Sequence, residues 1–472
     1  GRSVAITGTT VVVGAYLEDE DAAGANTLTT AGSAYVFSQN QGGSNNWDQV
    51  KKLVTSDRAA GDNFGWSIAI SGTTVVVGAP VEDEDAAGGN TLPNAGSAYF
   101  FEGTTTSPDY TITTTGNVLT ITDVSGNGET LDISQNSSNI RFNVTGRTYS
   151  IDGGTTTDFT TPADVALSGI TSIVVNTATG NDVINVGAFT ANLPSLTING
   201  GTGDDQVNFN GDITFATNAN LDVDLQNDDA SPGVDAITFA INANIVLQGT
   251  GVATLKVSKN VVFNNGSTLG TNNGNLTVEA NQQASPTTGN FSGVSMGGST
   301  QLQVLGSGTL TVKGKGGNDA TGSQIGVYLN FGGVIYGGNN TVSVIGNGGA
   351  SSGNSNYGIL IQGSTSKITS LGGNVTVEGT GGGTGTSAGN DGIRLATSGQ
   401  ITAAGTGAVT VTGRGGSAST GDNNIGVNVQ ASAKITSVGG NVIVNAYGGG
   451  SGTSQLNYGL SMSQSGEISA GG

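Results

Sequence analysis

Short apolar runs alternate with polar, glycine-rich segments in the C-terminal part of the chain, and the runs recur with a fixed period. Each period holds three runs rich in Val, Ile and Thr, the composition of β-strands. The runs begin at Leu310, Val342, Val375, Val409 and Val442, at Gly326, Gly358, Gly392, Gly426 and Gly459, and at Ile335, Ile368, Ile401, Ile435 and Ile468. Successive starts lie 32 to 34 residues apart. Three strands joined by turns in every repeat predict one coil of a parallel β-solenoid.

The N-terminal hundred residues contain a duplication with an offset of 64 positions. Residues 9–15 return as residues 73–79, and the acidic segment 18–24 returns as residues 82–88. The first copy contains four short strand-like runs, at residues 4–6, 11–13, 34–37 and 47–54. Four short strands in a unit of this length are typical of a propeller blade.

The second copy resembles the FG-GAP repeat of integrin-type β-propellers and bacterial surface proteins. Phe64-Gly65 corresponds to the FG of that repeat, and Gly78-Ala79-Pro80 corresponds to the GAP. The first copy begins at the glycine of its FG and has Tyr16 in place of the proline. The resemblance covers roughly residues 1 to 103 and implies two propeller-blade-like repeats. Because a propeller closes with about 4 to 8 blades, we expect further blades upstream or a different packing of these two.

These patterns predict an all-β chain with three parts. We expect the two FG-GAP repeats in residues 1–105 and a β-rich segment that leads into or caps the solenoid in residues 106–164. A right-handed parallel β-helix is expected in residues 165–472, because repeated parallel crossovers take that hand. Its coils are short up to about residue 270 and about 33 residues long afterwards.

Composition narrows the function classes. Of 472 residues 82 are Gly and only 7 are Pro, which suits turns and excludes a collagen-like chain. The chain carries 34 acidic and 14 basic residues, a net charge of −20, so its surface repels nucleic acid and anionic membranes and attracts divalent cations. It has no His and no Cys, the usual residues of many catalytic and zinc sites. No apolar stretch of about 18 residues is present, so we expect no membrane span.

Two acidic runs are candidate calcium sites in the FG-GAP repeats. Some blades of this family carry a calcium loop of alternating Asp or Asn followed by Gly, so the resemblance implies tentative calcium ligands in both copies. The residues concerned are Glu18, Asp19, Asp21, Glu82, Asp83 and Asp85. The runs depart from the family's loop, because Glu alternates with Asp and the glycine lies further away. The alternative is a solvated acidic hairpin that blunts edge-to-edge strand pairing.

A second candidate calcium site lies in two Gly-Asp turns. Residues 200–208 resemble the nonapeptide motif of haemolysin-type calcium-binding β-rolls at every fixed position. Residues 180–184 repeat the core of that motif one coil earlier. The predicted ligand set is Asp182, Gly203, Asp204 and Asp205. The alternative is a plain Gly-Asp turn without an ion.

Four glycine-rich loops of the long coils end with an asparagine at the same place, two residues before the repeated glycine. These residues are Asn356, Asn390, Asn424 and Asn457. Stacked coils would bring them into a column in which each amide donates to the carbonyl of the next, a structural ladder. The alternative is a polar track for a ligand. The protruding loops would form a continuous uncharged ridge, and such a ridge is the expected contact surface.

The combination resembles very large secreted surface proteins of bacteria. We therefore expect a non-enzymatic extracellular structural or adhesive protein, a segment of a fibre, layer or matrix that contacts surface polysaccharide or matrix proteins. The chain begins inside a blade and ends on a coil without a capping helix, which predicts self-association. The alternative to self-association is that the flanking parts exist but lie outside this sequence. The alternative is a carbohydrate-binding or polysaccharide-degrading β-helix, and a glycosidase of that class would need a pair of carboxylates on one face.

Overall fold

The structure is a computed structural model that describes all residues except 9, 40–46, 73, 85–88, 90, 103–107, 155, 227–232 and 472. The chain divides into two compact units, one of residues 1–112 and 145–162 and the other of residues 113–144 and 163–472. The predicted leading segment, residues 106–164, therefore contributes to both units. The described residues form strands and turns and contain no helix, and so none that could span a membrane.

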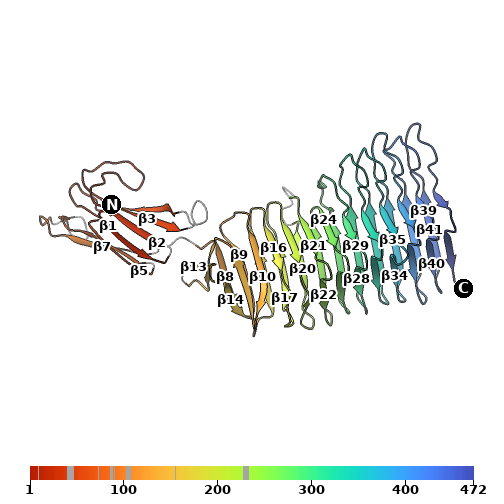
Figure 1. The fold of residues 1–472 in the computed structure, drawn as a ribbon, viewed down its shortest axis with the longest axis horizontal. Helices are drawn as coiled ribbons and strands as arrows, with labels where there is room; N and C mark the ends of the chain where they lie inside the picture. The colour runs from red at the N-terminus through yellow and green to blue at the C-terminus, as the bar shows by residue number, and fades with distance from the viewer. Residues whose placement is uncertain are drawn as a thin grey trace. The chain divides into compact units, whose positions relative to one another are not determined.

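The first unit contains two antiparallel sheets that correspond to the duplicated repeats (Figure 1). The first sheet consists of β1 (Ser3–Thr7), β2 (Thr10–Ala15), β3 (Ser33–Gln39) and β4 (Trp47–Leu53). The second consists of β5 (Ser67–Ser71), β6 (Thr74–Ala79) and β7 (Ser97–Phe101). The unit also includes β12 (Thr148–Ile151) and β13 (Thr157–Asp158), which pair antiparallel, and the start of β8 (Tyr110–Thr115). The first sheet has the four strands that the sequence predicts for a blade, whereas the second has three in the described part of the chain.

The glycines of the FG-GAP signature allow the two blades to approach closely. A Cβ atom on Gly14 would lie 2.0 Å from the carbonyl oxygen of Gly65, and Gly65 has a φ of +92°. The hydroxyl of Ser3 donates to the same carbonyl oxygen at 2.8 Å. Phe64, the aromatic residue of the signature, is fully buried and packs edge-on against Tyr99 with ring centroids 5.7 Å apart. The signature is thus a packing requirement of the interface between blades.

The second unit is a parallel β-solenoid with three sheets, and each later coil contributes one strand to each sheet. Its β9–β41 sheet contains β9 (Val118–Asp123), β15 (Ser172–Asn176), β17 (Ser195–Asn199), β20 (Leu221–Leu225), β23 (Ala253–Val257), β26 (Leu276–Ala280), β29 (Leu310–Lys315), β32 (Val342–Asn347), β35 (Val375–Thr380), β38 (Val409–Arg414) and β41 (Val442–Tyr447).

The β10–β42 sheet contains β10 (Thr130–Asn136), β16 (Val183–Val186), β18 (Gln206–Phe209), β21 (Ala236–Phe239), β24 (Asn260–Phe263), β27 (Val294–Met296), β30 (Val327–Asn330), β33 (Ile359–Gln362), β36 (Ile393–Ala396), β39 (Val427–Val429) and β42 (Leu460–Met462). Two antiparallel strands, β11 (Asn139–Val144) and β14 (Ala163–Ala166), extend this sheet beyond β10.

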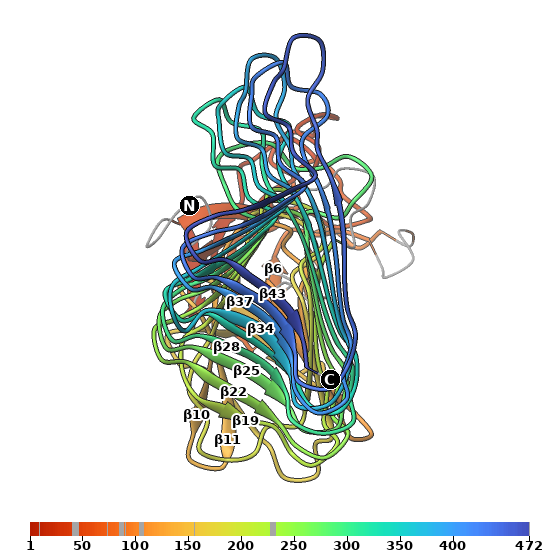
Figure 2. The ribbon, with the colours of Figure 1, turned by 90° about the vertical axis from the view of Figure 1, so that its right-hand side faces the viewer.

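The β19–β43 sheet contains β19 (Ile213–Thr214), β22 (Asn244–Leu247), β25 (Thr268–Thr271), β28 (Gln301–Val304), β31 (Val334–Gly337), β34 (Lys367–Ser370), β37 (Gln400–Ala403), β40 (Lys434–Ser437) and β43 (Glu467–Ala470). Figure 2, which faces the C-terminal coil, shows how the coils stack one behind another.

Strands of successive coils pair in parallel and in constant register. Val342 pairs with Val375, and Val375 pairs with Val409. The predicted β-solenoid is therefore confirmed, whereas its right-handed sense stays a prediction. Within the solenoid, parallel pairing from coil to coil begins with β9 and β10, whose partners are β15 and β16, upstream of residue 165.

Every second residue of each strand faces inward, and these side chains form the core of the solenoid. Val375, Ile393 and Ile401 come from the three strands of one coil, and all three are fully buried. Aromatic rings stack along the axis in the same way: Phe239 lies 4.9 Å from Phe209 and 4.4 Å from Phe263 between ring centroids. Each buried side chain therefore packs against its equivalents in the coils before and after it.

We predict that Phe239→Ala lowers the free energy of unfolding of the solenoid by about 3–5 kcal/mol, because it removes the middle ring of this stack. Thr238→Ala, on the outward face of the same strand, is the control and should change the free energy by less than about 0.5 kcal/mol. Urea denaturation monitored by hydrogen exchange in β18, β21 and β24 checks this. Equal effects of the two substitutions would contradict the assignment of the core face.

Candidate functional site

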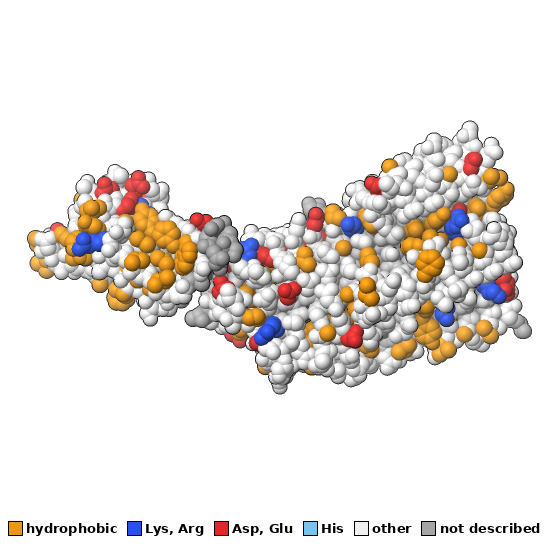
Figure 3. Space-filling model, viewed as in Figure 1, with side chains coloured by type: hydrophobic (Ala, Val, Ile, Leu, Met, Phe, Trp, Pro, Cys, Tyr) orange, Lys and Arg blue, Asp and Glu red, His pale blue; other side chains and the backbone are white. Residues whose placement is uncertain are grey.

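The loops between the β9–β41 and β10–β42 sheets form a ridge along one corner of the solenoid (Figure 2). The last four loops of the ridge cover residues 348–358, 381–392, 415–426 and 448–459. They contain two charged residues, of which Asp391 is buried, so Asp422 is the one exposed charge they carry. Figure 3 shows this region as mostly uncharged surface. The ridge presents hydroxyl, amide and backbone groups.

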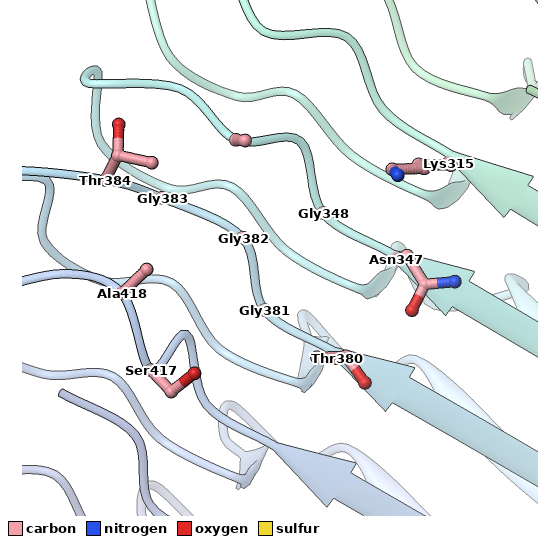
Figure 4. Close-up of a pocket in the computed structure, with 11 residues that line it drawn as sticks. Lys315, Asn347, Gly348, Thr380, Gly381, Gly382, Gly383, Thr384, Ser417 and Ala418 are labelled. Atoms are coloured by element: carbon pink, nitrogen blue, oxygen red, sulfur yellow. The ribbon is translucent and has the colours of Figure 1, made fainter. Parts of the chain in front are cut away.

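A groove of about 490 Å³ lies at the foot of this ridge (Figure 4). It is lined by Lys315, Asn347, Gly348, Ala350, Thr380, Gly381, Gly382, Gly383, Thr384, Ser417 and Ala418. Lys315, Asn347 and Thr380 are in register at the ends of three successive strands, so they form a row with a spacing of about 4.8 Å along one side. The groove offers hydrogen-bond donors and acceptors at every coil, and Lys315 is the one cationic side chain in its lining.

Stacking of the ridge loops requires small residues in the groove. A Cβ atom on Gly382 would lie 2.0 Å from the carbonyl oxygen of Gly349 in the preceding coil, and one on Gly381 would lie 2.0 Å from that of Asn390. A larger residue at either position would push neighbouring coils apart. The glycine content of the loops is therefore a consequence of backbone packing between coils.

The four predicted ladder residues stack in a column at the base of the ridge. Asn356, Asn390 and Asn424 are fully buried, and Asn457 is half-buried. The side-chain oxygen of Asn390 accepts the backbone N–H of Asn356 at 3.1 Å and its side-chain N–H at 3.0 Å. The oxygens of Asn424 and Asn457 serve the preceding asparagine in the same way. The column satisfies buried backbone donors of the loops as well as the amides themselves.

In the first blade, the predicted calcium residues bind neighbouring protein groups. The carboxylate of Glu18 lies 2.8 Å from the ammonium of Lys52 and accepts the hydroxyl of Ser33 at 2.5 Å. Burial acts to raise the pKa of Glu18, but these two partners hold it below its ordinary value. Asp19 accepts the backbone N–H of Thr30, and Asp21 accepts backbone N–H groups within its own turn. These carboxylates hold the acidic hairpin in shape.

The second blade has no lysine at the equivalent place. Glu82 is buried, and one of its oxygens accepts the hydroxyl of Tyr99 at 2.9 Å, while Asp83 accepts the backbone N–H of Asn94. Burial and nearby carboxylates raise the pKa of Asp62 to about 6. Asp85 lies outside the described residues.

The Gly-Asp turns place a column of buried carboxylates before the strands of the β10–β42 sheet. Asp182, Asp205 and Asp235 are each at least 98% buried. Asp205 accepts the backbone N–H of Asp182 at 2.9 Å, and Asp235 accepts that of Asp205 at 2.7 Å. Gly203 has a φ of +137°, and a Cβ atom there would lie 1.7 Å from the carbonyl oxygen of Gly180. Asp204 is exposed and accepts the N–H of Val234.

An acidic cluster lies at the N-terminal end of this column. Carboxylate oxygens of Asp123, Glu129 and Asp182 come within 4.8 Å of one another. Burial, together with the charges of Asp205 and Asp123, raises the pKa of Asp182 to about 7. Asp123 and Glu129 were missed by the sequence reasoning. The segment Asp-Val-Ser-Gly-Asn-Gly-Glu at residues 123–129 was the available signal, since calcium loops space oxygen-bearing side chains at alternate positions before a glycine.

The comparison with known protein families finds a match in the two blades. The sequence profile of the FG-GAP repeat family matches residues 1–37 and 47–101. The two blades carry FG-GAP repeats. Repeats of this family occur in surface proteins and adhesion-type proteins, and the predicted resemblance of the N-terminal part is confirmed. The haemolysin-type character of the Gly-Asp turns stays a prediction. No curated protein and no solved structure matches the chain.

We predict that Asn390→Ala destabilises the ridge-bearing coils by about 2–4 kcal/mol, because it removes the acceptor of the buried backbone N–H of Asn356 and one acceptor of its side-chain amide. Asn339→Ala provides the control, since Asn339 is exposed and its loss should cost less than about 0.5 kcal/mol. Hydrogen exchange of β33 and β36 during urea unfolding measures both effects. Unchanged protection in Asn390→Ala would show that the column contributes nothing to stability.

We predict that the chelator-treated protein loses stability as pH rises from 3.8 to about 7. The pKa of Asp182 is raised from 3.8 to about 7 in the folded state, so folding takes up a proton between these values and is favoured at low pH. Asp182→Asn keeps an oxygen acceptor and removes the titration, so melting temperature should depend less steeply on pH. Asp132→Asn, on the exposed face of β10, is the control and should leave the slope unchanged. An identical slope in Asp182→Asn would contradict the raised pKa.

Proposed function

We propose that the protein is a non-enzymatic extracellular structural or adhesive protein, a segment of a surface fibre, layer or matrix. The observation that supports this proposal is the presence, in one chain, of FG-GAP repeats and of a solenoid with a ridge and groove that contain few charged residues. FG-GAP repeats are typical of surface and adhesion proteins, and long loops aligned on one side of a solenoid are typical contact surfaces.

The chemistry of the groove favours contact over catalysis. Its lining residues supply one ammonium, amides, hydroxyls and backbone groups and no carboxylate, whereas glycoside hydrolysis uses a pair of carboxylates. Neutral hydrogen-bonding groups repeated every coil suit a polymer with a comparable repeat, such as surface polysaccharide or an extended polypeptide. We propose that a second copy of the chain also makes this contact, so that the protein self-associates.

A second candidate function, carbohydrate binding, is favoured by a hollow of about 320 Å³ on the outer face of the β19–β43 sheet. The hollow is lined by Gln301, Gln303, Val334, Tyr336 and Lys367. An aromatic ring flanked by amides and one ammonium offers a stacking surface and hydrogen bonds, the two kinds of contact that sugars make with proteins.

We also propose calcium as the stabilising cation of the chain. The acidic cluster at the start of the solenoid and the net charge of −20 support it, since clustered carboxylates favour hard divalent cations.

We predict that antibodies against residues 163–472 label intact source cells or their extracellular matrix, and that the purified chain forms concentration-dependent oligomers in light scattering. Ser417→Asp places a charge in the groove and should weaken oligomer formation at least about tenfold. Thr365→Asp adds the same charge at an exposed turn on another corner and should leave it unchanged.

Labelling confined to permeabilised cells would overturn the surface assignment. Oligomers that form equally well in Ser417→Asp would show that the groove is not the contact. Release of reducing ends from polysaccharides by the wild-type chain would replace the structural assignment with an enzymatic one.

A further inference from the structure

The first turn of the solenoid, between β9 and β10, lies against the turn that precedes β16. Asp123 is the last residue of β9, and Glu129 directly precedes β10. Asp182 directly precedes β16. The two turns bring carboxylate oxygens of these three residues within 4.8 Å of one another, although Glu129 and Asp182 are 53 residues apart in sequence. Parallel pairing of β10 with β16 holds this juxtaposition.

The loop of residues 123–129 is folded around its own oxygen atoms. Asp123 Oδ1 accepts the backbone N–H of Ser125 at 2.7 Å and its hydroxyl at 2.8 Å. The same hydroxyl oxygen lies 3.1 Å from Glu129 Oε1. The loop therefore brings a hydroxyl oxygen and two carboxylates together, and Asp182 joins them from the turn before β16.

Asp182 points independently to a ligand. Its side chain is 98% buried, and Oδ1 accepts the backbone N–H of Glu129 at 2.9 Å. Oδ2 is also buried and has no hydrogen-bond partner among the described residues. Asp182 forms no ion pair with a lysine or arginine in the described part of the chain. A buried carboxylate oxygen without a partner is strongly unfavourable unless a cation or proton compensates it.

The later coils show that the hydrogen bonds alone do not require a carboxylate. Asn390 and Asn424 use a neutral amide oxygen to accept the backbone N–H of the preceding coil, as Asp182 and Asp205 do with charged oxygens. Ser258 does so with a hydroxyl at the end of the acidic column, where it accepts the N–H of Asp235. Because neutral residues suffice for the stacking role, stacking does not explain the carboxylate of Asp182, whose second oxygen is buried and available to a cation.

We propose that Asp123, Glu129 and Asp182 bind one Ca²⁺ at the first turn of the solenoid. The proposal rests on the use of calcium proposed above and assigns its site to these residues rather than to the acidic runs of the blades. The available ligands are all oxygens, which Ca²⁺ prefers. Oxygens that all lie within 4.8 Å of one another can reach a single ion at about 2.4 Å, the usual Ca²⁺–O distance.

The ion joins the first two coils. It links the loop after β9 to the turn before β16, so it fixes the register in which the first parallel strands pair. The stacking of all later coils continues that register. The bound ion therefore stabilises the beginning of the solenoid, the part without a preceding long coil to pack against.

The test uses the full chain after chelator treatment, with CaCl₂ as the probe. Calorimetric titration should show one strong site, and Ca²⁺ should raise the melting temperature and slow hydrogen exchange in residues 118–132 and 177–186. Asp182→Asn and Glu129→Gln should each weaken binding at least about tenfold and abolish local protection. Asp132→Asn, an exposed carboxylate on the same coil, should behave as wild type. Without calcium, Asp182→Asn should melt at or above wild type, which shows that it folds.

The outcomes separate the two proposals. If Ca²⁺ changes neither melting temperature nor exchange in the wild-type chain, calcium is not a stabilising cation of this protein. If the wild-type chain responds but Asp182→Asn and Glu129→Gln respond equally, calcium binds elsewhere and the site assignment is wrong. If Mg²⁺ gives the same protection at the same concentration, the site is a general divalent site and the assignment to Ca²⁺ fails.

Discussion

Parallel hydrogen bonding between successive coils is the constraint on which the solenoid depends. Each strand pairs with its equivalent in the next coil at about 4.8 Å and without a change of register. Every side-chain position therefore becomes a column, and each residue must be compatible with its own equivalents above and below. Valine on valine and phenylalanine on phenylalanine satisfy this rule inside the core. At the turns it demands either glycine or a side chain that hydrogen-bonds to its neighbour in the column.

The turn before the β10–β42 sheet shows two chemical solutions to the same problem. The first coils use Asp182, Asp205 and Asp235, and later coils use Asn356, Asn390 and Asn424, in both cases to accept a backbone N–H of the preceding coil. A column of neutral amides needs no counter-charge, whereas a column of buried carboxylates brings like charges together where water solvates them poorly. The proposed Ca²⁺ supplies a counter-charge at the Asp182 end of the acidic column.

On the outer surface, some residues are required for the stacking of the coils, and others are exposed and available for contact with a partner. The ridge loops are long where the coils are long, and their glycines are required by close backbone approach, as at Gly382. The polar side-chain groups that line the groove are hydroxyls, an amide and the Lys315 ammonium. A surface with few charges and a regular spacing of hydrogen-bonding groups suits a repetitive partner. This property connects the solenoid to the structural and adhesive role proposed for the chain.

The sequence by itself determined the repeat, the strand positions and the fold class, because period and register are local properties: Val342, Val375 and Val409 occupy equivalent places both in the repeat and in the sheet. It also identified the FG-GAP repeats and the asparagine positions. The tertiary structure decided which acidic residues meet. Glu18 meets Lys52 across its own blade, whereas Asp182 meets Asp123 and Glu129, because coil stacking joins residues more than fifty positions apart. In the regular coils the sequence pattern determines the register of the strands. The first coil is irregular, and only the folded chain shows that its loop of residues 123–129 contacts the turn before β16.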